Sequence, residues 1–144
     1  TALDYANVFN VSLSTEVQLA EPLKWTTQFV YTRGKDNDKK NLPFMSPFSY
    51  QTSLRFQKNK FSSDLSLLGN TKHNNFAAIY GESATPDYFI MNASLGYLFN
   101  VNTNKILVKA GVENLFDRFY TTYSDWNRIP RPGRNFFLNL NFVW

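Results

Sequence analysis

The chain has 144 residues, no cysteine and a net charge of +4, and 17% of its residues are aromatic. The absence of cysteine excludes disulfides, thiol chemistry and cysteine-based zinc sites, and the modest, dispersed positive charge gives no basis for nucleic-acid binding. The mean hydropathy is −0.37 and no apolar run approaches the ~20 residues of a membrane helix, so a helical membrane protein is excluded, whereas a barrel of alternating strands is not.

Seven stretches of the chain alternate apolar and polar side chains with the two-residue period of a β-strand. The first, for example, places Val11 and Leu13 on one face and Ser12 and Ser14 on the other. Most of them are longer than the ~5–6 residues of soluble strands and match the ~9–11 residues of a tilted membrane strand. They occupy residues 7–19, 23–33, 49–57, 61–67, 88–99, 105–113 and 134–144.

The connections between these stretches are alternately short and long. Short turns are predicted at residues 20–22, 58–60 and 100–104, and long loops at residues 34–47, 69–87 and 114–133. An outer-membrane barrel connects its strands in this way, with short periplasmic turns and longer extracellular loops. We therefore predict an all-β fold, an antiparallel up-and-down transmembrane β-barrel, whose last strand ends on the periplasmic side.

The final stretch has the sharpest alternation. One face carries only apolar side chains, and the other carries two amides, Asn139 and Asn141. Such a strand suits a barrel whose outer face meets membrane lipid, although a half-buried strand of a soluble sheet has the same period. The pattern resembles the assembly signal that the barrel-insertion machinery of bacterial outer membranes reads. The residues predicted to form this signal are Phe136, Leu138, Leu140, Phe142 and Trp144.

Seven strands do not close a bacterial barrel, because single-chain barrels of this kind have an even number of strands. An open seven-stranded sheet also has two unpaired edges, which lipid does not tolerate. The chain begins at Thr1, without an initiator methionine or a signal peptide. We therefore expect residues 1–144 to be a portion of a longer chain whose other strands complete the barrel.

Two motifs near the end of the chain carry a family resemblance. Residues 111–120 read G-V-E-N-L-F-D-R-F-Y, and a P-G-R step precedes the last strand. Both resemble the C-terminus of TonB-dependent outer-membrane receptors. Asn114 and Asp117 are expected to turn the chain through local hydrogen bonds, and Gly133 to adopt a backbone conformation that other residues resist. The residues given a structural role are Asn114, Leu115, Phe116, Asp117, Pro132, Gly133 and Arg134.

This resemblance implies a ~22-stranded barrel in the bacterial outer membrane, closed inside by an N-terminal plug domain that is not in this chain. Residues 1–144 are then the C-terminal part of the barrel domain. Transport in the family is active, because the proton-motive force reaches the plug through TonB, and it implies neither an enzyme nor a cofactor. The inward-facing residues expected to contact the plug are Arg55, Asp64, Lys109 and Glu113.

Members of the family carry ferric siderophores, haem, cobalamin, copper, zinc or carbohydrates. The last long loop places arginines beside aromatic residues, which suits an anionic aromatic chelate such as a catecholate siderophore. We therefore expect a small iron chelate as the ligand, with copper, zinc, haem and cobalamin as alternatives. The loop residues expected to contact the ligand are Lys35, His73, Tyr80, Tyr123, Trp126 and Arg128.

Metal-binding and catalytic patterns are absent from the sequence. His73 is the only histidine and is expected to lie at the surface, and Met45 stands alone, so neither a metal site nor a catalytic residue is predicted. Two other classes of protein stay open. A soluble ligand-binding β-barrel or sandwich turns its apolar faces inward, and a passive porin or adhesin barrel has no plug.

Overall fold

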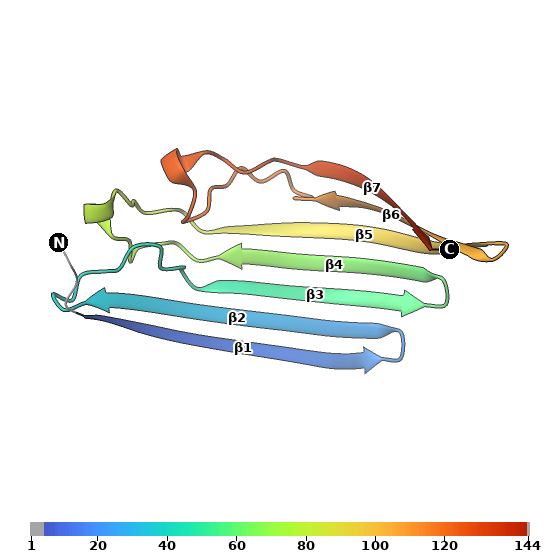
Figure 1. Ribbon diagram of the computed structural model, residues 1–144, viewed down its shortest axis with the longest axis horizontal. Coiled ribbons are helices and arrows are strands. Elements are labelled where there is room, and N and C mark those ends of the chain that lie inside the picture. Colours follow the sequence, from blue (N-terminus) through green and yellow to red (C-terminus); the bar gives the residue numbers. More distant parts are fainter. Residues whose placement is uncertain (1–4, 144) are drawn as a thin grey trace.

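The computed structural model describes residues 5–143, apart from the side chains of Trp126 and Val143. The chain forms one antiparallel sheet in which the strands follow one another in sequence order, as Figure 1 shows. This arrangement confirms the predicted seven-stranded meander. The strands are β1 (Ala6–Ala20), β2 (Leu23–Asp36), β3 (Ser49–Lys58), β4 (Phe61–Asn70), β5 (Tyr88–Val101), β6 (Asn104–Glu113) and β7 (Asn135–Val143).

Tight turns connect the strands at one end of the sheet, and longer loops connect them at the other (Figure 1). Two of the tight turns place an asparagine in the left-handed region, with φ of 53° at Asn59 and 55° at Asn102. Asparagine tolerates this conformation better than other residues with a Cβ, which explains its position in these turns. All of the predicted short connections therefore lie on the same side of the molecule.

Several strands extend further than their alternation predicts. β2 continues to Asp36 because Gly34, Lys35 and Asp36 still pair with the start of β1, and β4 continues to Asn70, opposite Tyr88. The prediction that the loops begin at residues 34 and 69 was therefore wrong. Charged and small residues ended the apolar pattern there, but backbone pairing to a neighbouring strand does not require apolar side chains.

The two faces of the sheet differ in chemistry. What we call the apolar face carries the odd-numbered residues of β1, β2, β4 and β5 and the even-numbered residues of β3, β6 and β7, because residues opposite one another in the register share a face. Its side chains are widely exposed, for example 59% at Leu13 and 57% at Leu95. The opposite side is the polar face.

The predicted assembly signal lies on the apolar face of β7. Phe136, Leu138, Leu140 and Phe142 have exposed fractions of 75%, 65%, 53% and 59%, whereas Trp144 lies outside the described residues. No helix in the described part of the chain, residues 5–143, is long and apolar enough to cross a membrane.

Buried side chains concentrate at the end of the sheet that bears the long loops. Among the described residues they comprise three apolar and three polar ones, which are Leu42, Ala77, Ile90, His73, Thr85 and Asn114. All except Ile90 belong to the loops. The packed part of this segment therefore lies among the loops, while both faces of the sheet stay open.

Candidate functional site

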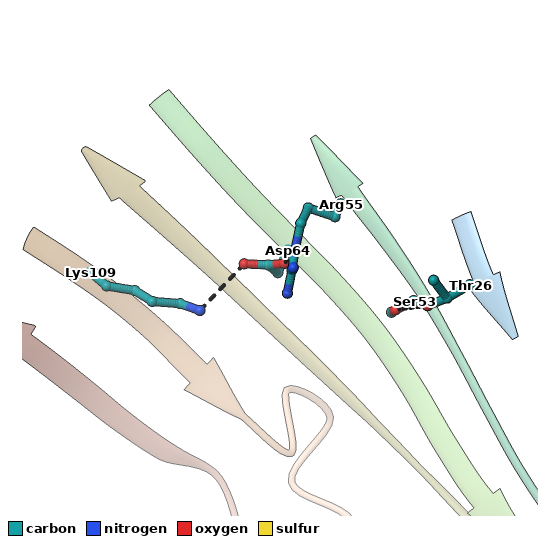
Figure 2. A network of polar contacts seen from close by, with 5 residues as sticks. All are labelled: Thr26, Ser53, Arg55, Asp64 and Lys109. Carbon is teal, nitrogen blue, oxygen red and sulfur yellow. Dashed lines mark hydrogen bonds and ion pairs between the residues drawn. The ribbon is translucent and has the colours of Figure 1, made fainter. Parts of the chain in front are cut away.

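Charged side chains form a chain of contacts across the polar face (Figure 2). Asp64 of β4 accepts a hydrogen bond from Arg55 Nε at 2.6 Å and another from Lys109 Nζ at 3.3 Å. Arg55 lies directly opposite Asp64 in the register of β3 and β4. Lys24 lies opposite Arg55 and is paired with Glu16 at 2.6 Å. Two carboxylates thus hold three cations on this face.

Small residues of β5 make room for Lys109 to reach Asp64. Gly96 lies opposite Lys109, and Ser94 lies opposite Asp64. Glycine has no side chain and the serine side chain is short, so nothing on β5 separates the Lys109 ammonium group from the Asp64 carboxylate. Because exposed ion pairs contribute only ~0–1 kcal/mol each to stability, the main consequence of the network is the polar surface that it presents.

A cavity of about 300 Å³ on this face is lined by all four residues predicted to face the plug, which are Arg55, Asp64, Lys109 and Glu113. Glu113 accepts a hydrogen bond from Asn135 Nδ2 at 3.2 Å instead of joining the ion pairs. The structure therefore brings these four residues together on one face, and their contact with a plug stays a prediction.

Glu82 joins two of the long loops to each other. Its Oε1 accepts a hydrogen bond from the Phe44 amide at 2.6 Å, and its Oε2 accepts one from the Ala77 amide at 2.7 Å. The side chain of Asn41 adds a bond to the Phe76 carbonyl at 3.3 Å. We refer to the three packed connections, residues 37–48, 71–87 and 114–134, as the loop cap.

The third loop joins the loop cap through Arg128 and Tyr123. Arg128 donates to Ser83 Oγ from Nε at 3.1 Å and from Nη2 at 2.9 Å. Tyr123 packs edge-on against His73, with ring centroids 5.8 Å apart. All three loops are thereby tied into one unit by side chains that bond to neighbouring loops.

His73 is 2% exposed, which corrects the expectation that it lies at the surface. The carbonyl groups of Met45 and Asn75 approach its ring, but neither imidazole nitrogen is hydrogen-bonded to a described residue. Burial lowers the pKa of the imidazole below its ordinary value. The ring is therefore neutral at pH 7 and has an available lone pair.

His73 and Met45 line the same cavity, which has a volume of about 100 Å³. Met45 stood alone in the sequence, and the folding of the first two loops against each other places it here. The described residues that line this cavity include no carboxylate. The donors that line it include a thioether and an imidazole, the ligands that soft metals prefer, together with amide and hydroxyl oxygens and the cations of Arg33 and Lys72.

A second cavity of about 300 Å³ is lined by Tyr123 and Arg128 together with Phe44 and Glu82. The predicted ligand-binding residues are therefore divided between two cavities. Lys35 lies in β2 and not in a loop, and Tyr80 is 47% exposed in the 3₁₀-helix η1 (Ala78–Tyr80); neither lines this cavity. Trp126 begins the 3₁₀-helix η2 (Trp126–Arg128), but its side chain lies outside the described residues.

Asp125 forms hydrogen bonds within the last loop. Its Oδ2 accepts hydrogen bonds from the Thr122 amide at 2.6 Å and from Arg131 Nε at 3.0 Å. Burial raises the pKa of the Asp125 carboxyl, but the bonds from Arg131 and Thr122 outweigh burial, and the net pKa lies below its ordinary value. The folded loop therefore favours the charged carboxylate.

This linkage predicts that the last loop loosens in acid. The stabilisation is complete at neutral pH and is lost as the pH falls below the ordinary aspartate value of about 3.9 and through the lower pKa of the folded loop. We expect the hydrogen-exchange protection of the Thr122 amide to fall about tenfold from pH 7 to pH 3. In Asp125→Asn this amide is expected to be equally unprotected at the two pH values. Protection that does not depend on pH in the unaltered protein contradicts this role.

The predicted turn after β6 is confirmed, with φ of 50° at Asn114 and 53° at Asp117. Asp117 Oδ1 accepts a hydrogen bond from the Arg134 amide at 2.7 Å, which ties this turn to the start of β7. The reason predicted for Gly133 was wrong, because its φ is not positive. A Cβ at this position lies only 2.6 Å from Asp117 Oδ1, so glycine leaves room for that carboxylate to bond to the Arg134 amide.

Sequence reasoning missed the part played by Glu82, because its partners are the backbone amides of Ala77 and of the distant Phe44 and leave no pattern in the sequence. Within the described residues, no group of three or more His, Cys, Asp or Glu side chains is placed to hold a metal ion.

No family model and no curated protein matches the sequence. The fold is similar to that of a solved structure, the copper transporter OprC, with a TM-score of 0.82 and 22% sequence identity. The likeness covers 94% of this chain and 23% of the OprC chain, so this chain spans less than a quarter of the protein that it resembles. The seven-stranded antiparallel sheet is therefore a segment of the β-barrel fold.

Proposed function

We propose that this chain is the C-terminal part of the barrel of a TonB-dependent transporter, which imports a scarce metal across the bacterial outer membrane. The observation that carries the proposal is the exposed apolar face, which runs along all seven strands. Leaving such a face in water costs roughly 25 cal/mol per Å², and soluble monomers avoid apolar patches of this extent. Membrane lipid covers it without a partner protein.

The arrangement of the connections gives the orientation. The tight turns face the periplasm and the loop cap faces the exterior, as in other outer-membrane barrels. The exposed apolar side chains of β7 suit recognition by the barrel-insertion machinery. This orientation places both cavities of the loop cap on the side from which a nutrient arrives.

The polar face suits contact with a plug domain. Arg55 and Lys109 are held by Asp64 without being buried, so their remaining hydrogen-bond donors face the barrel interior. We assign the upstream plug, its contact with TonB and the use of the proton-motive force from the resemblance of residues 111–120 and of the P-G-R step to that family. The role of the chain in this account is transport and not catalysis.

We propose a small metal chelate, first of all a ferric siderophore, as the cargo. Arg128 and Tyr123 offer a cation and an aromatic ring in the second cavity of the loop cap, and such groups bind anionic aromatic chelates. The carboxylates of Glu82 and Asp125 line the same cavity and accept hydrogen bonds from within the loops. The contacts of Lys35, Tyr80 and Trp126 with the cargo stay predictions.

Copper is the second candidate cargo, because His73 and Met45 line one cavity. A thioether and a neutral imidazole select Cu(I) over hard cations, and the absence of a carboxylate among the described lining residues points in the same direction. The similarity in fold to a copper transporter adds support.

Starvation and uptake test the proposed function. The full-length protein is quantified in outer-membrane fractions of cells starved separately of iron, copper, zinc and cobalamin, and uptake of a radiolabelled ferric catecholate and of radiolabelled copper is measured with and without TonB. We expect the abundance to rise under one metal starvation and uptake of that metal to require TonB. Absence from the outer membrane, or uptake that is independent of TonB, contradicts the proposal.

The copper candidate predicts an effect of Met45→Leu, which keeps the side-chain volume but removes the thioether. Copper uptake by the full-length protein is expected to fall at least tenfold, because one of the two soft ligands is lost. The matched control is Met91→Leu, since Met91 lies on the apolar face of β5. Equal copper uptake by both variants removes the copper candidate and leaves the ferric chelate.

A further inference from the structure

The cavity that His73 and Met45 line contains a buried imidazole without a hydrogen-bond partner. His73 is 2% exposed, and neither Nδ1 nor Nε2 is bonded to a described residue. Buried polar groups of proteins are nearly always satisfied by protein, water or a bound ligand, because leaving them unpaired is costly. The ring therefore requires a molecule or ion that enters the cavity.

The thioether of Met45 is held close to strand β2. A Cβ built on Gly34 would lie 2.6 Å from Met45 Sδ and 2.8 Å from Leu42 Cδ1, so the absence of a side chain at Gly34 makes room for the sulfur. Gly34 lines the same cavity and pairs with Val8 of β1. The sulfur therefore packs against the backbone of a paired strand, which fixes one wall of the cavity.

Two cationic residues line this cavity as well. Arg33 belongs to β2 and Lys72 to the second loop, and both side chains are exposed. Neither side chain forms an ion pair or a hydrogen bond within residues 5–143. The carboxylate that acts on His73 is that of Glu82, but Glu82 is bonded to two backbone amides and lines the other cavity. Positive charge therefore remains at this cavity.

This charge opposes the entry of a bare copper ion. Like charges repel, and neither the thioether nor the neutral imidazole offsets the repulsion. Cu(I) held by these two donors still accepts a third ligand, and a soft metal prefers a soft one. A chloride ion is such a ligand, whereas fluoride is a hard anion. One anion on the copper therefore supplies the third ligand and balances the positive charge.

The size of the cavity agrees with a small anion. Its volume is about 100 Å³, and a cavity of ~150 Å³ holds a single benzene molecule. A copper ion with one halide fits this space, and an organic chelate with an aromatic ring does not. The two cavities of the loop cap therefore differ in the cargo that they accept.

We propose that this cavity binds Cu(I) together with one small soft anion, chloride being the simplest. Met45 and His73 are the protein ligands of the metal, and Arg33 and Lys72 attract the anion. The inference rests on the copper candidate of the proposed function and names the species that enters. Because metal and anion share one site, each strengthens the binding of the other by the same factor.

The chloride dependence of the copper affinity tests this inference. The full-length protein in detergent is titrated, under a reductant, with Cu(I) buffered by bicinchoninate. The titration is done in sodium chloride and in sodium fluoride, each at the ~0.15 M of physiological ionic strength. Fluoride screens charge to the same extent but is a poor ligand for a soft metal. We expect the copper affinity to be at least tenfold higher in chloride.

Three variants divide the site into its parts. Arg33→Gln with Lys72→Gln should abolish the difference between the two salts, because nothing then attracts the anion. Met45→Leu should lower the copper affinity in both salts, which assigns the measured binding to this cavity. Lys39→Gln is the matched control, since Lys39 is an exposed cation of the first loop that does not line the cavity. It should keep the full effect of chloride.

Equal copper affinity in the two salts overturns the inference, and so does a chloride effect that survives in the variant without Arg33 and Lys72. In either case, copper binding that still depends on Met45 leaves the copper candidate standing. Absence of Cu(I) binding in both salts removes the copper candidate together with the inference and leaves the ferric chelate as the proposed cargo.

Discussion

Gly111→Ala is expected to disrupt the pairing of the last three strands. Gly111 lies on the polar face of β6, opposite Ser94 of β5 and Phe137 of β7. A Cβ at this position lies 2.5 Å from Phe137 Cζ and 2.7 Å from the Ala93 carbonyl oxygen. The phenyl ring can turn away, but the carbonyl is part of the strand pairing and cannot move without breaking it.

The expected loss is roughly 3 kcal/mol of folding free energy, the upper part of the range for overpacking. It is measured as a shift in the urea midpoint of the full-length protein folded in lipid vesicles. Gly96→Ala is the matched control, because a Cβ there closely approaches only the Ser62 hydroxyl, at 2.5 Å, which a rotation of that side chain relieves. Similar midpoints for the two variants contradict the steric argument.

Asn114→Ala should be comparably destabilising, because a single side chain closes the turn between β6 and the last loop. Asn114 is 3% exposed. Its Nδ2 donates to the carbonyls of Arg118 at 2.8 Å and Pro132 at 3.3 Å, and its Oδ1 accepts from the Arg118 amide at 2.8 Å. Alanine removes all three bonds and tolerates the φ of 50° at this position less well than asparagine does.

Each partner left unsatisfied costs about 1–3 kcal/mol when buried, and the left-handed conformation about 1–2 kcal/mol. Because water reaches part of this turn, we expect a total near 3 kcal/mol, measured again by urea titration. Asn59→Ala isolates the backbone contribution, since Asn59 has a φ of 53° in an exposed turn. If Asn59→Ala is as damaging as Asn114→Ala, the hydrogen bonds of Asn114 do not hold the turn.

The strands could be predicted because their signal is local. Alternation along β7 or β1 records which side of the sheet is apolar, and it needs no knowledge of the neighbouring strand. The strand ends were predicted less well, because pairing of Lys35 with Asn7 and of Asp36 with Ala6 depends on the partner strand and not on apolar side chains. The topology could be predicted as well, because the lengths of the connections can be read from the sequence and a short turn joins neighbouring antiparallel strands.

The loop cap could not be predicted, because its contacts join residues far apart in sequence. Glu82 bonds to backbone amides, which every residue type except proline provides, and so it leaves no motif. His73 and Met45 belong to different loops and meet only when those loops pack. Gly133 is a different case. The absence of a side chain there makes room for the Asp117 carboxylate, and its own φ does not call for glycine.

The most direct test of the central claim is the reactivity of single cysteines toward a membrane-impermeant maleimide in intact cells. The chain has no cysteine of its own, and any cysteine elsewhere in the full-length protein is replaced. Ile79→Cys tests the loop cap, where Ile79 is 75% exposed, and Leu138→Cys tests the apolar face, where Leu138 is 65% exposed. Lys60→Cys tests the tight turn between β3 and β4.

We predict that the cysteine at position 79 reacts in intact cells, that the one at position 60 reacts only after the outer membrane is opened, and that the one at position 138 reacts only after denaturation, because lipid covers it. Reaction at position 138 as fast as at position 79, without denaturation, contradicts the barrel account and indicates a soluble sheet.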